Sequence, residues 1–231
     1  MPNYFQENRK KVQQAIFREG FILPILSDTL VIKEDGKNAL LKEVEICDIP
    51  FDIDRPVSWL MDMEFSSKGL FSNPQGVKTS EKVLLVMTKQ QLLVCMIEMK
   101  STIQDWESNS RSLSAIIDQK FRDTIDRVCI YLPINIHDAS YDNIKLAFTG
   151  VVCYNHDKVS QIPTNLRHKK IHQQFKSNQK YGQTRVDTKV HGSIALKLHF
   201  FKNPVGSNSR FSISFSEIFP DFKETDLYCL H

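Results

Sequence analysis

The chain has 231 residues, of which 41% are hydrophobic and 10% aromatic, and its formal net charge is +3. This composition is typical of a folded protein with one large domain, or with one domain and an added lobe. No stretch approaches the ~20 apolar residues of a membrane span, and from the polar start MPNYFQENRKK we expect no secretory signal. The five cysteines form no C-x-x-C pair, which excludes a zinc knuckle and favours a reducing, cytoplasmic setting.

The first part of the chain is predicted to contain one helix followed by short strands. Apolar residues recur at helical spacing over 4–19, and Gly20 ends this helix. The Asp35-Gly36 pair predicts a turn between strands at 30–32 and 39–41, because both residues tolerate a positive φ. Alternation over 61–65 predicts a short strand that carries Asp62 and Glu64 on one face.

The middle of the chain is predicted to form a β-hairpin followed by a helix and further strands. Two apolar strands, at 82–87 and 92–100, are joined by a polar turn. An amphipathic helix is predicted over 111–127; its apolar face consists of Leu113, Ile116, Ile117, Phe121 and Ile125. An uninterrupted apolar run predicts a buried strand at 128–134, and another strand is expected at 144–154. This order predicts a parallel strand–helix–strand crossover within an α/β fold.

The last third is predicted to begin with a basic segment and to end in a hairpin. Residues 161–188 are polar and basic, which is typical of a mobile insertion. Strands at 190–201 and 210–215 are predicted to pair as a C-terminal hairpin. We therefore expect three regions: an α/β core at 1–157 with a central mixed β-sheet flanked by helices, a basic insertion at 158–189, and a hairpin at 190–231 that packs on the core.

The triplet Glu98-Met99-Lys100 ends the second strand of the predicted central hairpin. Side chains alternate along a strand, so Glu98 and Lys100 point the same way, with Met99 on the opposite face. A carboxylate and an amine thus lie side by side at the rim of an otherwise apolar strand. Two charges in such a place are expected to be paired, solvated or used. A carboxylate can hold a hard divalent cation, and a neighbouring lysine can orient or activate a water molecule.

This arrangement of a hairpin, an E-x-K triplet, a polar loop and an amphipathic helix resembles the PD-(D/E)XK nuclease family. The resemblance covers roughly the middle third of the chain. It implies a restriction-endonuclease-like core and a metal-dependent DNA endonuclease, with Mg²⁺ or Mn²⁺ as cofactor and a role in restriction, repair or defence. It also implies assembly as a homodimer or in a larger nucleoprotein complex.

The resemblance implies a second metal-binding carboxylate, which the family places as an aspartate at the start of the preceding strand. Residues 83–87 contain no aspartate. Glu81 is the preferred replacement, Asp62 is the next candidate, and Glu64 lies near Asp62. If none of them serves, the centre is inactive. Some family members place a glutamine or lysine of the following helix close to the metal, which makes Gln119 and Lys120 further candidates, although both also suit a surface position.

The basic segment predicts a nucleic-acid contact, because its cations are clustered while the chain around 34–64 is acidic. The residues predicted to bind the DNA backbone are Arg167, Lys169, Lys170, Lys176, Lys180 and Arg185. A solvated basic loop without a partner is the simpler interpretation of the same residues.

Three hypotheses for the function follow. In the first, the chain is a metal-dependent endonuclease with Glu98, Lys100 and Glu81 in its catalytic centre. In the second, it is a degenerate subunit with a nuclease fold, which binds nucleic acid or a protein partner without cleaving. In the third, Glu98 and Lys100 form a surface ion pair worth about 0–1 kcal/mol in an α/β interaction module.

Overall fold

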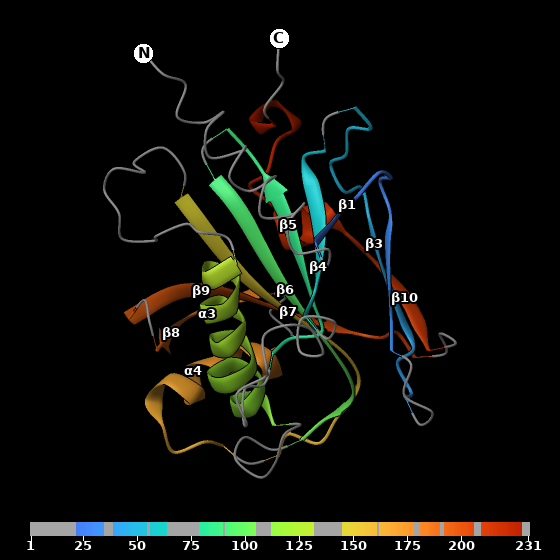
Figure 1. Ribbon diagram of the computed structural model, residues 1–231. Helices are drawn as coiled ribbons and strands as arrows, with labels where there is room; N and C mark the ends of the chain where they lie inside the picture. The colour runs from blue at the N-terminus through green and yellow to red at the C-terminus, as the bar shows by residue number, and fades with distance from the viewer. Residues whose placement is uncertain are drawn as a thin grey trace.

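The computed structural model (Figure 1) describes residues 22–34, 39–54, 56–63, 79–89, 91–104, 112–131, 145–160, 162–177, 181–189, 192–205 and 209–227. The helix predicted at 4–19, the turn at Asp35-Gly36, Glu64 and Lys180 lie outside these residues. Within the described ranges, no helix is long and apolar enough to cross a membrane.

A seven-stranded mixed sheet forms the centre of the molecule. Its strands are β1 (Ile22–Pro24), β4 (Ser58–Asp62), β5 (Lys82–Met87), β6 (Gln91–Ile103), β7 (Lys145–Asp157), β8 (Tyr181–Thr188) and β9 (Gly192–Lys202). They lie in the order β1-β4-β5-β6-β7-β9-β8. The pairs β6–β7 and β7–β9 are parallel, and the other pairs are antiparallel. The structure therefore confirms an α/β fold with a central mixed sheet, and it confirms the β5–β6 hairpin that carries the E-x-K triplet.

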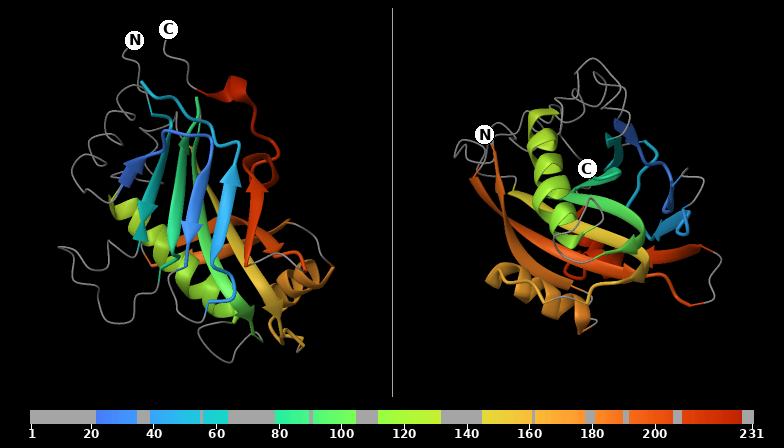
Figure 2. Two further views of the ribbon diagram at one scale, coloured as in Figure 1. Left: turned by 90° about the vertical axis from the view of Figure 1, so that its right-hand side faces the viewer. Right: turned by 90° about the horizontal axis from the view of Figure 1, so that it is seen from below.

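A second sheet of three strands lies beside the large one (Figure 2). It consists of β2 (Leu30–Lys33), β3 (Glu43–Cys47) and β10 (Arg210–Ser214), in the order β10-β3-β2. The strand predicted at 39–41 is wrong, because residues 39–42 belong to no strand and the antiparallel partner of β2 is β3. The predicted C-terminal hairpin is wrong, because β9 belongs to the large sheet and β10 pairs in parallel with β3. Alternation identifies a half-buried strand, but it does not identify the strand's partner.

The helices are η1 (Ala115–Phe121), α3 (Arg122–Tyr131), α4 (Leu166–Lys176), α5 (Phe215–Ile218) and η3 (Glu224–Asp226). The π-helical segment η1 continues directly into α3. The five residues predicted as the apolar face of this helix are all fully buried. The strand predicted at 128–134 is wrong over its described part, since α3 extends to Tyr131. A short apolar run does not distinguish a buried strand from the end of a buried helix.

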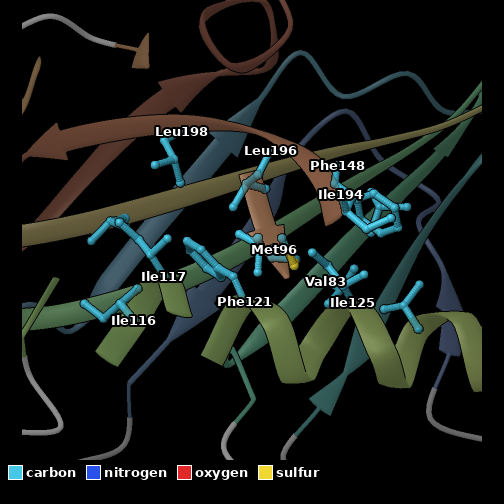
Figure 3. Packing of buried hydrophobic residues seen from close by; sticks show 14 of the residues in the cluster. Val83, Met96, Ile116, Ile117, Phe121, Ile125, Phe148, Ile194, Leu196 and Leu198 are labelled. Atoms are coloured by element: carbon cyan, nitrogen blue, oxygen red, sulfur yellow. The ribbon is translucent and has the colours of Figure 1, made fainter. Parts of the chain in front are cut away.

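Two apolar cores cover the two faces of the large sheet. Residues of η1, α3 and α4 share one cluster with β5, β6, β7 and β9 (Figure 3). Residues of the small sheet and α5 share the other cluster with the opposite sides of these strands. The side chains along β6 divide accordingly, with Val94 and Met96 facing the helices and Cys95 and Ile97 facing the small sheet. This division places Glu98 on the helix side.

The segment expected to form a basic insertion contains α4 and the edge strand β8. Strand β8 pairs with β9 from Tyr181–His199 to Thr188–Gly192. Helix α4 contributes Ile171 and Phe175 to the core on the helix side, and β8 contributes Val186. A few apolar residues at the correct spacing thus attach an otherwise polar and basic segment to the sheet.

The contact between β7 and η1 requires glycine at position 150. A Cβ atom built on Gly150 would overlap the ring of Phe121. We expect Gly150→Ala to lower the free energy of unfolding by about 1–3 kcal/mol, because overpacking a filled core forces its neighbours to move. Urea denaturation measures the loss. In a Phe121→Leu background the same change should cost less, and equal costs in both backgrounds would contradict the packing described here.

Candidate active site

Four charged side chains from three elements meet on the helix side of the large sheet. Glu98 and Lys100 lie in the carboxyl-terminal half of β6, Glu81 immediately precedes β5, and Lys120 lies on η1. The backbone N–H of Glu81 donates to the carbonyl oxygen of Ile97 at 3.2 Å, which holds Glu81 beside Glu98. The structure thus brings together three residues that the sequence assigned to catalysis, together with Lys120, which was a further candidate from the sequence.

The contacts of this cluster are centred on one oxygen of Glu98. The ammonium groups of Lys100 and Lys120 both contact Oε1 of Glu98. Lys100 Nζ also lies 3.6 Å from Oε1 of Glu81 and donates to the carbonyl oxygen of Met99 at 3.0 Å. Oε2 of Glu81 accepts from the backbone N–H of Met99 at 3.3 Å. Two carboxylates and two ammonium groups therefore form one continuous network.

The cluster is buried, and it contains a carboxylate oxygen without a partner among the described residues. The side chain of Glu98 is 0% exposed, and those of Glu81, Lys100 and Lys120 are 13–17% exposed. Oε2 of Glu98 accepts no hydrogen bond from the described residues. An unpartnered buried oxygen costs free energy, so its presence calls for an explanation. A cation held by Oε2 of Glu98 and by Glu81 would supply the missing interaction, because Mg²⁺ and Mn²⁺ prefer carboxylate oxygens.

The two carboxylates influence each other's protonation. Burial, followed by the negative charge of Glu98, raises the pKa of Glu81 to about 8, against the opposing effect of Lys100. Burial by itself would lower the pKa of Lys100, but the adjacent Glu98 and Glu81 outweigh it and raise this pKa above its usual value. At neutral pH, Glu81 therefore holds a proton and Lys100 is a cation. A bound divalent cation would favour the ionised form of Glu81.

A buried hydroxyl pair fixes η1 to the start of β5. Thr124 Oγ1 donates to the carbonyl oxygen of Lys120 at 2.7 Å and accepts from the backbone N–H of Ser80 at 2.8 Å. The Ser80 and Thr124 hydroxyl oxygens are 3.1 Å apart. Ser80 precedes Glu81, so this contact sets the position of the helix that carries Lys120 relative to the strand that carries Glu81. Position 120 lies in the π-helical segment, a helix form that is frequent at functional sites.

The other predicted ligands lie elsewhere. Asp62 pairs with Lys82 at 2.8 Å on the face of the sheet opposite Glu81, because residues 81 and 82 alternate. The structure therefore does not bring Asp62 to Glu98. Gln119 lies next to Lys120 on η1, but the contact with Glu98 is made by Lys120. Glu64 lies outside the described residues.

The predicted nucleic-acid contacts are distributed over α4 and β8. Arg167, Lys169, Lys170 and Arg185 line a common pocket, whereas Lys176 does not line it and contacts Asp157 at 3.4 Å. Burial tends to raise the pKa of Asp157, but its contacts with Lys202 and Lys176 outweigh this and lower it. Lys180 lies outside the described residues.

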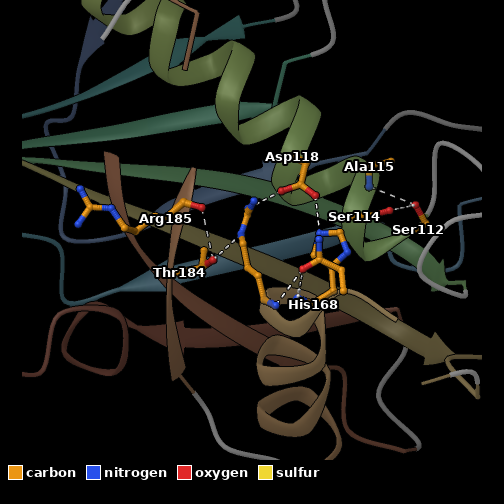
Figure 4. A network of polar contacts seen from close by, with 9 residues as sticks. Ser112, Ser114, Ala115, Asp118, His168, Thr184 and Arg185 are labelled. Atoms are coloured by element: carbon orange, nitrogen blue, oxygen red, sulfur yellow. Dashed lines mark hydrogen bonds and ion pairs between the residues drawn. The ribbon is translucent and has the colours of Figure 1, made fainter. Parts of the chain in front are cut away.

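A polar network that the sequence did not indicate joins this region to η1 (Figure 4). Asp118 on η1 contacts the guanidinium of Arg167, and its Oδ2 lies 2.6 Å from Nε2 of His168. The Nε of Arg167 donates to the hydroxyl of Thr184 at 2.9 Å. The network therefore ties the start of α4 and strand β8 to the helix that carries Lys120. Asp118 and His168 are 50 residues apart, and no local pattern links them.

No group of three or more His, Cys, Asp or Glu side chains with the geometry of a metal site occurs in the part of the chain that the structure describes. Glu81 and Glu98 are therefore a two-carboxylate set, to which water or substrate oxygens would have to be added. Comparisons with protein-family models, curated proteins and solved structures find no match to this chain.

Proposed function

We propose that this chain is a metal-dependent DNA endonuclease whose centre consists of Glu81, Glu98, Lys100 and Lys120. The observation that supports this proposal most strongly is Oε2 of Glu98, which is buried beside a second carboxylate and has no partner in the part of the chain that the structure describes. Glu81 occupies the position at the start of the preceding strand where the PD-(D/E)XK pattern has an aspartate. Its longer side chain reaches the E-x-K triplet through Lys100 and the backbone of Met99.

Glu98 and Glu81 would hold the cation. When bound, Mg²⁺ or Mn²⁺ would neutralise charge on the scissile phosphate and lower the pKa of a bound water molecule. Lys100 is a cation at neutral pH, so it would donate hydrogen bonds to the attacking water or a phosphate oxygen and would not act as a base. Lys120 would supply a second positive group from the helix side.

The cations of α4 and β8 support DNA as the substrate class. Lys169, Lys170 and Arg185 lie on α4 and β8 and belong to the segment in which the cations of the chain are clustered. Such cations bind the phosphate backbone without reading bases. Cleavage of both strands would require two centres, which makes a homodimer part of the proposal.

A second candidate is a subunit that binds DNA without cleaving it. The observation that favours this candidate is the charge balance of the cluster, in which two ammonium groups already share one oxygen of Glu98. In a cleaving enzyme, the two ammonium groups would break their contacts with Glu98 when a cation binds and would contact the phosphate instead. In a non-cleaving subunit the same contacts would be permanent and would only stabilise the fold.

Cleavage assays on plasmid and linear DNA with Mg²⁺ or Mn²⁺ distinguish the candidates. We expect the wild type to cleave and Lys100→Ala to lose cleavage while it retains DNA binding. Lys82→Ala is the matched control, because Lys82 also lies on the large sheet but pairs with Asp62 away from the centre. Binding without cleavage by the wild type would favour the second candidate, and cleavage by Lys100→Ala at the wild-type rate would refute the first.

A further inference from the structure

A pocket of about 1200 Å³ lies between α4, the edge strand β8, the amino-terminal parts of β7 and β9, and residues 219–226. We call it the basic pocket. It is separate from the centre at Glu98: Leu93 lines the pocket and precedes Glu98 on β6 by five residues, roughly 17 Å of extended strand. Pockets that hold organic ligands typically have volumes of about 300–1,000 Å³, so this one is larger than an inorganic anion needs.

Positive charge dominates the lining of the basic pocket. Six of its side chains are cationic and two are acidic: Lys89, Arg167, Lys169, Lys170, Arg185 and Lys197, against Asp221 and Asp226. A pocket with this charge favours a ligand that carries phosphate groups, because a low-dielectric wall strengthens the attraction.

Two of these cations are available to a ligand. Four are engaged by the protein itself. Lys197 lies 3.4 Å from Asp221, and Lys89 Nζ donates to the carbonyl oxygen of Thr225 at 2.7 Å. Arg167 contacts Asp118, and Arg185 donates to the hydroxyl and the carbonyl oxygen of Ser193, both at 3.1 Å. Lys169 and Lys170, in contrast, form no ion pair and no side-chain hydrogen bond with any described residue. They are consecutive residues near the start of α4, and both line the pocket.

The pocket also offers apolar and aromatic surface. Phe219 and Phe222 line it together with Leu93 and Ala147. Phe222 is half-buried and packs edge-to-face against Phe215 at a ring-centroid distance of 5.1 Å, which holds its ring in place. Aromatic rings of this kind support the flat face of a nucleobase. The amides of Gln173 and Gln183 can hydrogen-bond to its edge.

We infer that the basic pocket binds a nucleotide, with its phosphate groups on Lys169 and Lys170 and its base against the rings of Phe219 and Phe222. The nucleotide is either free or part of a single strand, since both present the same phosphate and base. Binding requires neither a divalent cation nor cleavage at Glu98. The inference deepens the proposed function, which assigns Lys169 and Lys170 to the DNA backbone, but it can be tested without the centre at Glu98.

Fluorescence anisotropy with a short fluorescein-labelled oligothymidine tests this inference on the full chain in EDTA, where no cleavage occurs. We expect the wild type to bind and Lys169→Gln/Lys170→Gln to bind at least about tenfold more weakly at low salt. The slope of log Kd against log salt should also fall by about 1.4, since each phosphate contact to a single strand contributes about 0.7.

The control is Lys202→Gln, which removes an exposed lysine of β9 that pairs with Asp157 and does not line the pocket. This variant should bind almost as tightly as the wild type. Equal weakening by Lys202→Gln and by the double variant, or no weakening by either, would overturn the inference. Competition by unlabelled dATP, but not by inorganic tripolyphosphate, would assign the pocket to free nucleotides, and competition by an unlabelled strand alone would assign it to strands. Equal competition by tripolyphosphate and dATP would refute recognition of the base.

Discussion

Replacing Glu98 by glutamine is expected to abolish metal-dependent cleavage by this chain. Glu98 is the one fully buried carboxylate of the cluster, and its Oε2 has no partner among the described residues. A glutamine of the same size would present at most one neutral oxygen to a cation. We expect the cleavage rate to fall at least about 100-fold, since even residues that only orient a metal ligand affect metal affinity by about 10–100-fold.

The control for this prediction is Asp62→Asn. It removes a carboxylate from the neighbouring strand β4, where Asp62 pairs with Lys82 and not with the cluster. This variant should retain cleavage within about twofold, as is usual for an exposed ion pair of small energetic value. Initial rates on plasmid DNA, with circular dichroism to verify folding, measure both variants. Loss of cleavage in Asp62→Asn together with retained cleavage in Glu98→Gln would mean that the metal binds at Asp62 and not at Glu98.

Metal affinity is expected to rise steeply with pH up to about pH 8. Burial and the charge of Glu98 raise the pKa of Glu81 from 4.5 to about 8, so the side chain is protonated at neutral pH without a cation. A metal ligand must be ionised, so each cation bound below this pH releases one proton from Glu81. We expect the dissociation constant for Mn²⁺ to decrease about tenfold from pH 6 to 7 and less steeply from pH 7 to 8.

In the absence of metal, the raised pKa of Glu81 lowers the stability of the folded state as the pH rises, whereas metal affinity increases over the same range. Because the folded-state pKa of Glu81 lies above its ordinary value of 4.5, its contribution to stability is complete below about pH 4.5 and is lost as the pH rises through about 8. Glu81→Gln cannot titrate, so both dependences should be reduced in this variant. A Mn²⁺ affinity that does not change between pH 6 and 8 in the wild type would contradict the raised pKa.

Local patterns predicted which side chains meet around Glu98. Alternation along 92–100 placed Glu98 and Lys100 on one face, and helical periodicity predicted the buried face of η1 and α3. Glu81 was the preferred partner because it directly precedes a strand of the same hairpin, and the β5–β6 register does place it beside Glu98. Sequence alone left Glu81, Asp62 and Glu64 open, because the choice depends on which face each one occupies.

The features that sequence did not predict depend on contacts between distant segments. The partner of β10 is β3, more than 160 residues earlier, and nothing in either strand specifies this pairing. Strand β8 was obscured by its polar composition, since it is an edge strand that exposes Gln183, Arg185 and Asp187. The basic pocket likewise combines α4, β8 and residues 219–226, and this combination arises only when the large sheet is complete.

Titration of the wild-type chain with Mn²⁺ by calorimetry, at about pH 8.5 where Glu81 is mostly ionised, tests the central claim most directly. The proposed centre predicts a cation site that disappears in the Glu81→Gln/Glu98→Gln double variant and persists in Asp62→Asn. Absence of Mn²⁺ binding by the folded wild type, or binding that survives in the double variant, would contradict a metal centre at Glu81 and Glu98.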